Sequence, residues 1–208
     1  MPSHFLYLIE TNVVIPSIYR RSNPTLIHGV LHLLQNRRRT YYPDLYEKLL
    51  QNFTGPIFDF GSGINGFSYK FLLNKNKYIA VEGVGQLVNL MNDYFKKNKI
   101  NGKAIHLSLF DLEEIKKLLK NEKKEKIVFL FKVLDSLEML ERDYSKKLLM
   151  EITPLVKRVV VSFATRSMIK KTKFKAKRNW IIDFIEENFK IVDSFEIGNE
   201  LYIVFKIR

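Results

Sequence analysis

Short apolar runs alternate with longer amphipathic runs from residue 57 to the end of the chain. Continuously apolar runs such as Ile127–Phe131 are typical of strands that are covered on both faces. Strands that alternate with helices predict a mostly parallel α/β sheet. The predicted strands lie near 57–60, 77–82, 103–107, 127–132, 157–163, 190–196 and 200–207. The predicted helices lie near 65–74, 85–98, 111–121, 136–153 and 176–188.

The last two strands are joined differently from the others. Only Ile197–Glu200 separates them, which is too short for a crossover helix and predicts a hairpin turn. We therefore expect a seven-stranded, mostly parallel sheet with an antiparallel last strand.

The first part of the chain has helical periodicity. Apolar residues recur at helical spacing between Leu26 and Leu34, and Pro43–Asp44 suits the start of a second, short helix. Thr54–Pro56 is typical of a turn. We predict a small helical N-terminal extension over residues 1–53, followed by an α/β domain over residues 54–208.

A glycine-rich turn follows the first predicted strand. Gly61, Gly63 and Gly66 form a G-x-G-x-x-G pattern before a helical run, and Glu82 ends the next strand 16 residues after the pattern. Glycine allows a sharp turn and close approach of a ligand, and an acid near this offset typically binds ribose hydroxyls. The pattern predicts a site for a nucleoside-containing cofactor. The alternative is a glycine-rich turn that binds no ligand.

The chain is strongly basic. Its 208 residues include 35 basic and 22 acidic residues, which gives a formal net charge of +13. Such a protein is expected to meet a polyanion, most simply a nucleic acid; the alternative is the lysine-rich surface of a heat-adapted protein. The chain has no cysteine, no recognisable signal peptide and no apolar run near the ~20 residues of a membrane span. We expect a cytoplasmic protein with no membrane partner.

The positive charge is clustered. Between Arg166 and Arg178, seven of thirteen residues are basic and none is acidic. This segment follows the fifth predicted strand, at the sheet edge where parallel sheets bind ligands. It suits a phosphate backbone held next to a cofactor, whereas a charge run is otherwise an ordinary solvated face. Arg20–Arg21 and Arg37–Arg39 are further clusters in the N-terminal extension.

The architecture bears on the cofactor. NAD enzymes and S-adenosylmethionine (SAM) methyltransferases both bind ligands at the carboxyl ends of parallel strands. A sheet closed by a C-terminal hairpin, with Asp59 just before the glycines, resembles the Rossmann-like class I SAM-dependent methyltransferases. Such folds place an acid after the third strand against the adenine, and Asp111 has that position; its alternative role is the N-cap of the next helix.

Four segments resemble the aminoglycoside-resistance 16S rRNA (guanine-N7) methyltransferase family. Phe129–Glu138 is similar to the family's LLLKxLxxLE segment, Val159–Ser167 to VVSFPTRSL, Asp59–Asn65 to DLGCGLNP, and Gly198–Leu201 to the terminal NEL. Their order and spacing match from about residue 37 to the end. The family transfers a methyl group from SAM to N7 of a guanine in the small ribosomal subunit. The resemblance therefore implies a SAM cofactor and a ribosomal RNA partner.

The chain also departs from the family pattern. Known members have a longer helical N-terminal domain, and their HxSTRERL segment corresponds only loosely to residues 35–42 here. The acid that binds the ribose is usually aspartate but is Glu82 in this chain, and Gly66 and Ala164 replace prolines. These departures weaken the expectation for the target nucleotide, whereas they have little effect on the expected cofactor-binding fold.

The resemblance and the motifs assign a role to each matching residue. The residues expected to bind SAM are Asp59, Gly61, Gly63 and Asn65 around the methionine end, Glu82 at the ribose, Asp111 and Leu112 at the adenine, and Lys132 near the methyl donor. Lys132 has the alternative role of capping its strand. Arg166 and Ser167 are expected beside the target base. The residues expected to bind RNA are Arg37, Arg38, Arg39, Arg166, Lys170, Lys171, Lys173, Lys175 and Arg178.

Guanine N7 has a lone pair and no proton, so the transfer requires no general base and the enzyme mainly aligns the reactants. His28 and His32 lie one helical turn apart and are interpreted as packing, so no metal is expected. Trp180 and Phe184 are expected on the core face of a helix, with stacking on a flipped base as the alternative. We expect a monomer.

Other functions stay open at this stage. A methyltransferase that acts on a small molecule or a protein would bind its substrate with little dependence on salt. An RNA-binding module with a degenerate cofactor pocket would not bind SAM. A dehydrogenase is a third possibility, but the second nucleotide-binding half of that class is missing.

Overall fold

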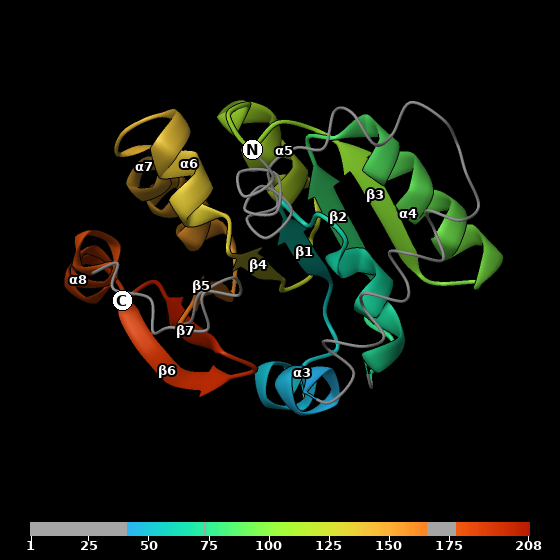
Figure 1. Cartoon of the computed structure of the whole chain (residues 1–208), viewed down its shortest axis with the longest axis horizontal. Helices are drawn as coiled ribbons and strands as arrows, with labels where there is room; N and C mark the ends of the chain where they lie inside the picture. Colours follow the sequence, from blue (N-terminus) through green and yellow to red (C-terminus); the bar gives the residue numbers. More distant parts are fainter. Residues whose placement is uncertain (1–40, 73, 166–177) are drawn as a thin grey trace, which may run out of the picture. The chain divides into compact units, whose positions relative to one another are not determined.

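The computed structural model describes residues 41–72, 74–165 and 178–208. The chain divides into two compact units, Met1–Leu109 (unit 1) and Phe110–Arg208 (unit 2). Among the described residues, the three strands of unit 1 have the order β3-β2-β1 and the four strands of unit 2 have the order β4-β5-β7-β6 (Figure 1). The predicted α/β class with a mostly parallel sheet is confirmed. The predicted boundary between residues 53 and 54 stays a prediction.

Unit 1 is built on three parallel strands. β1 (Ile57–Phe60) pairs with β2 (Tyr78–Glu82), and β2 pairs with β3 (Gly102–His106). Every residue of β1 and β2 is buried, as their mostly apolar sequences predicted, and the buried residues include Asp59 and Glu82. In the register of β2 and β3, Glu82 lies opposite His106. The carboxyl ends of these strands therefore bring the glycine-rich turn, Glu82 and His106 to one edge of the unit.

The described part of unit 1 also contains three helical segments: α3 (Tyr42–Leu50), the 3-10 helix η1 (Asn65–Phe71) and α4 (Gly85–Lys97). Figure 1 shows α4 running alongside β2 and β3. The α-helix predicted near residues 65–74 is wrong in type, because this stretch forms only a short 3-10 helix. Asparagine and glycine at its start are weak helix formers, and 3-10 geometry is common in such short connectors.

Unit 2 contains β4 (Ile127–Phe131), β5 (Arg158–Ala164), β6 (Lys190–Ile197) and β7 (Glu200–Lys206). β4 and β5 are parallel, whereas β7 is antiparallel to both β5 and β6. Gly198 and Asn199 join β6 to β7 with φ of 60° and 65°, as a two-residue hairpin turn with two left-handed positions requires. The predicted antiparallel last strand is confirmed.

Outside residues 166–177, the helices of unit 2 are α5 (Leu112–Asn121), α6 (Leu134–Leu140), α7 (Tyr144–Ile152) and α8 (Asn179–Asn188), with the 3-10 turn η2 (Thr153–Leu155). The single helix predicted near residues 136–153 is wrong. Asp143 has a φ of 61° and separates α6 from α7, and its N–H donates to Glu138 Oε1 over 2.9 Å. In the described part of the chain, no helix has the length and apolar character needed to span a membrane.

Candidate functional site

The turn after β1 combines two kinds of glycine. Gly61 and Gly63 have φ of 65° and 52°, a left-handed conformation that other residues adopt at a cost. Gly66 lies in a tight space, because a Cβ there would lie 2.7 Å from Met91 Sδ of α4 and the methionine side chain would have to shift. The first two glycines thus shape the turn, and the third lets the following segment pack closely on α4. The sequence pattern did not distinguish these two roles.

Hydrogen bonds fasten this turn to the end of β2. The N–H groups of Gly61 and Ser62 donate to Val81 O over 2.9 and 3.1 Å. The N–H of Gly63 donates to Glu82 Oε2 over 2.8 Å. The turn therefore directs these three N–H groups toward the end of β2.

Glu82 joins the glycine turn to the turn that follows β2. Its Oε2 accepts from Gly63, and its Oε1 accepts from the N–H of Val84 over 2.9 Å. The side chain is buried, and burial raises the pKa of its carboxyl above the usual value, although the backbone N–H donors act in the opposite direction. His106 holds the same second turn, since its Nε2 lies 2.9 Å from Gly83 O. One carboxylate thus sets the spacing of the two turns where a nucleoside is predicted to bind.

Asp59 and Asn65 are both buried beneath the glycine turn. Asn65 Nδ2 donates to Asp59 Oδ2 over 2.8 Å, and the hydroxyl of Tyr78 donates to the same oxygen. Asn65 Oδ1 in turn accepts from the hydroxyl of Tyr42 in α3 over 2.8 Å. Both predicted SAM residues therefore support the turn from below. Tyr42 and Tyr78 were not among the predicted site residues. Their positions on the apolar face of α3 and within β2 nevertheless indicate that their hydroxyl groups would be buried.

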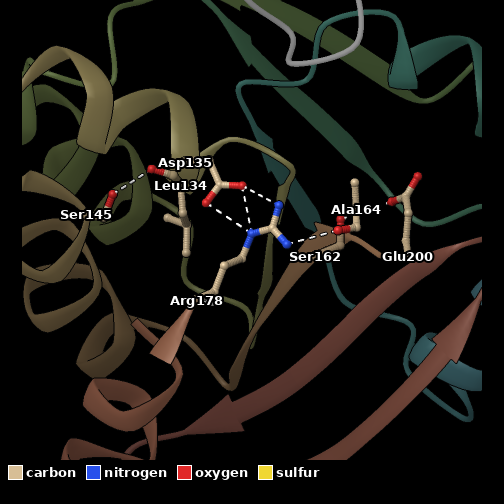
Figure 2. Close-up of polar contacts among 7 residues, drawn as sticks. All are labelled: Leu134, Asp135, Ser145, Ser162, Ala164, Arg178 and Glu200. Carbon is tan, nitrogen blue, oxygen red and sulfur yellow. Dashed lines mark hydrogen bonds and ion pairs between the residues drawn. The ribbon is translucent and has the colours of Figure 1, made fainter. Parts of the chain in front are cut away.

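Unit 2 has a second polar cluster at the carboxyl ends of β4 and β5. Lys132, which follows β4, has a φ of 57° and forms an ion pair with Glu200 over 3.2 Å. Glu200 Oε2 also accepts from Ser162 Oγ and from the hydroxyl of Tyr202, each over 3.1 Å (Figure 2 shows Ser162 and Glu200). A non-glycine residue in the left-handed region is unusual and often marks a functional position. Glu200 entered the sequence analysis only as part of a resembling segment.

Arg178 is held by unit 2 itself. Its Nε and NH2 groups both lie 2.9 Å from Asp135 Oδ2, and its NH1 donates to Ala164 O over 2.9 Å (Figure 2). The guanidinium also lies 5.4 Å from the ring centre of Phe163, and only 11% of the side chain is exposed. Arg178 therefore ties α6 to the end of β5. This arrangement gives it a structural role that competes with its predicted contact to RNA.

The other predicted positions have varied surroundings. Asp111 precedes α5 but its side chain forms no capping hydrogen bond, so its alternative role as a side-chain cap is not supported. In α8 the fully buried residues are Ile181 and Ile185, while Trp180 and Phe184 are half-buried and Phe184 packs on Phe189. In the described ranges no group of three metal-ligating side chains is present. The predicted residues outside the described parts are Arg37, Arg38, Arg39, Arg166, Ser167, Lys170, Lys171, Lys173 and Lys175.

Known proteins match this chain by fold and not by sequence. No protein-family model and no curated protein matches the chain by sequence. Many solved structures match by fold. WbdD, crystallised with a kinase inhibitor, matches with a TM-score of 0.65 and 15% identity over 95% of this chain and 47% of its own.

Two solved 16S rRNA methylases match over most of this chain. ArmA matches with a TM-score of 0.65 and 21% identity, over 99% of this chain and 97% of its own. RmtF, solved in complex with S-adenosyl-L-homocysteine, matches with a TM-score of 0.65 and 16% identity, over 88% of this chain and 75% of its own. At these identities the similarity concerns the fold, and the chain has the fold that these 16S rRNA methylases share.

Proposed function

We propose that the protein is a SAM-dependent methyltransferase that modifies N7 of a guanine in 16S rRNA of the small ribosomal subunit. The observation that carries the proposal is the position of Glu82, a buried carboxylate that bridges a glycine turn and the turn after β2. Its support comes from the fold shared with ArmA and with RmtF, which was solved with S-adenosyl-L-homocysteine.

The residues of the glycine turn fit a donor of this kind. The carboxylate of Glu82 accepts backbone N–H groups of the glycine turn and of the turn after β2, and we expect it also to accept a ribose hydroxyl. Gly61 and Gly63 would allow close approach of the methionine end, with Asp59 and Asn65 acting through the turn that they hold. Asp111 and Leu112 are proposed to flank the adenine. When bound, SAM supplies an electrophilic methyl group.

The acceptor requires alignment rather than a base. The lone pair of guanine N7 can attack without loss of a proton, so the protein has to hold the base and exclude water. Lys132, Arg166 and Ser167 are proposed to act beside the target base. The basic residues named in the sequence analysis, in residues 37–39 and 166–178, are proposed to contact the phosphate backbone.

The decisive experiment combines the protein, methyl-labelled SAM and isolated small ribosomal subunits. We expect label in 16S rRNA, at a guanine that becomes sensitive to chain cleavage at 7-methylguanine. Glu82→Ala should abolish most of the label, whereas Glu125→Gln, a change at a side chain that is 70% exposed, should not. Label at another atom of the RNA would refute the N7 assignment, and absence of label with intact subunits and with naked RNA would refute an RNA substrate.

A non-RNA substrate is the second candidate, because a fold alone does not determine the substrate, and WbdD, crystallised with a kinase inhibitor, matches at a similar TM-score. This candidate predicts that the protein binds S-adenosylhomocysteine but that its affinity for RNA is weak and nearly independent of salt. An RNA methyltransferase should instead lose RNA affinity steeply as salt rises. Filter binding at several salt concentrations distinguishes the two.

A further inference from the structure

A continuous chain of buried polar groups connects α3 to β1 within unit 1. The hydroxyl of Tyr42 donates to Asn65 Oδ1, and Asn65 Nδ2 donates to Asp59 Oδ2, each over 2.8 Å. The hydroxyl of Tyr46 forms a hydrogen bond with Ser68 Oγ, which donates to Asn65 O over 2.6 Å. α3 thus holds both the side chain and the backbone carbonyl of Asn65.

Packing alone does not explain the hydroxyl groups of α3. The ring of Tyr42 stacks on Tyr46 and on Phe71, with ring centres 5.5 and 5.6 Å apart. A phenylalanine would make the same ring contacts without bringing a polar atom into a site that is only 2% exposed. A buried hydroxyl is tolerated because it has a partner, so each tyrosine adds orientation to the packing that its ring provides.

The chain of hydrogen bonds has one direction. Burial raises the pKa of Tyr46 and of Tyr78 well above the usual value, so both hydroxyls stay protonated and can donate. The hydroxyl of Tyr78 and the amide nitrogen of Asn65 both donate to Asp59 Oδ2, and the amide oxygen of Asn65 faces the hydroxyl of Tyr42. Tyr42 therefore selects the amide orientation that satisfies Asp59.

Asn65 is part of the turn that is proposed to hold the donor. It lies between Gly63 and Gly66, and its N–H donates to Ser62 O over 2.8 Å. Gly63 in turn donates to Glu82. The glycine turn is therefore held at two points, by Glu82 from the β2 side and by α3 through Asn65.

We propose that Tyr42, with Tyr46 in support, is a positioning residue for the donor site: α3 sets the shape of the glycine turn, and hence donor affinity, through the amide of Asn65. This inference rests on the proposed function, because it requires that the turn binds an adenosyl donor. It assigns a role in cofactor binding to a helix of the predicted N-terminal extension, where Arg37, Arg38 and Arg39 are expected to bind RNA.

The first test measures S-adenosylhomocysteine binding by calorimetry, with the stability of each variant measured by urea unfolding. Tyr42→Phe keeps the ring and removes one oxygen, and we expect about three- to tenfold weaker binding by the folded protein. Tyr69→Phe is the matched control, since Tyr69 is a buried tyrosine of η1 whose ring packs on Tyr78 and Phe95 and whose hydroxyl is outside this network. Its binding should stay within twofold of the wild-type protein.

Asn65→Asp supplies a readout that a purely structural role would not change. The substitution places a second carboxylate against Asp59, so a proton must be shared between them for the bond to form. The loss of donor affinity relative to the wild-type protein should be largest near pH 8 and should shrink as the pH is lowered. A loss of donor affinity that does not vary with pH would contradict the proposed role of the hydrogen-bond chain.

The wild-type protein provides a measurement that needs no variant. Coupling is reciprocal, so S-adenosylhomocysteine should slow hydrogen exchange at the backbone amides of α3 several-fold. If the wild-type protein binds the ligand but Tyr42→Phe binds it equally well and α3 shows no protection, the inference is wrong and the proposed function stands. If the wild-type protein does not bind the ligand, the proposed function fails first and the inference fails with it.

Discussion

Glu82→Gln tests the arrangement on which the candidate site depends. The carboxylate accepts the N–H of Gly63 on one oxygen and the N–H of Val84 on the other. Glutamine has nearly the same shape but only one acceptor oxygen, so its NH2 group must face one of these two donors. The substitution therefore changes hydrogen bonding without opening a cavity.

The expected magnitude follows from this geometry. A buried N–H left without an acceptor costs about 1–3 kcal/mol, and removing a buried charge returns part of that cost. We expect the free energy of unfolding to fall by about 1–2 kcal/mol. Donor affinity should fall more, by about ten- to a hundredfold, because the ribose hydroxyls lose a charged acceptor worth about 1.5–3 kcal/mol.

The assay is urea unfolding together with calorimetry of S-adenosylhomocysteine binding. Glu125→Gln serves as the control, since its side chain is 70% exposed and pairs with Lys157. If Glu82→Gln binds the ligand within twofold of the wild-type protein and unfolds at the same urea concentration, then Glu82 neither bridges the two turns nor receives the ribose.

The pH dependence gives an independent check with a definite sign. Burial raises the pKa of Glu82 above its usual 4.5, so the folded protein takes up this proton more readily than the unfolded chain does. The contribution of Glu82 to stability therefore improves as the pH falls through the folded pKa. Donor affinity should instead fall as the pH falls, because the protonated carboxyl of Glu82 is no longer a charged acceptor. Glutamine does not titrate, so donor binding by Glu82→Gln should lack this pH dependence.

Three further experiments test other features. Gly63→Ala should cost about 1–2 kcal/mol in urea unfolding, because φ is 52°, whereas Gly83→Ala should be close to neutral because no atom lies within 4 Å of its added Cβ. A double-mutant cycle on Arg178→Gln and Asp135→Asn should give a coupling energy of about 1–2 kcal/mol, and a value near zero would show that their contact does not stabilise unit 2. Glu200→Gln should lower stability by about 2 kcal/mol, because it leaves the ammonium of its lysine partner largely buried without a full counter-charge.

The features that could be predicted from sequence are periodic or local. Mostly apolar runs predicted β1, β2 and β4 within one residue, and the spacing of Ile197–Glu200 predicted the hairpin. The single helix predicted near residues 136–153 was wrong because its apolar periodicity continues through the break. The break is at Asp143, which has a left-handed backbone, and an aspartate is also common on the surface of an unbroken helix.

The chain of amino acids by itself determined an alternating α/β fold with a glycine turn followed by an acid, because each of these signals lies within one or two elements. Only the tertiary structure decided which polar groups meet. Tyr42 and Asn65 are 23 residues apart, Ser162 and Glu200 are 38 apart, and Arg178 and Asp135 are 43 apart. A hydrogen bond depends on distances of a few tenths of an ångström, and these follow from how whole elements pack rather than from any local pattern.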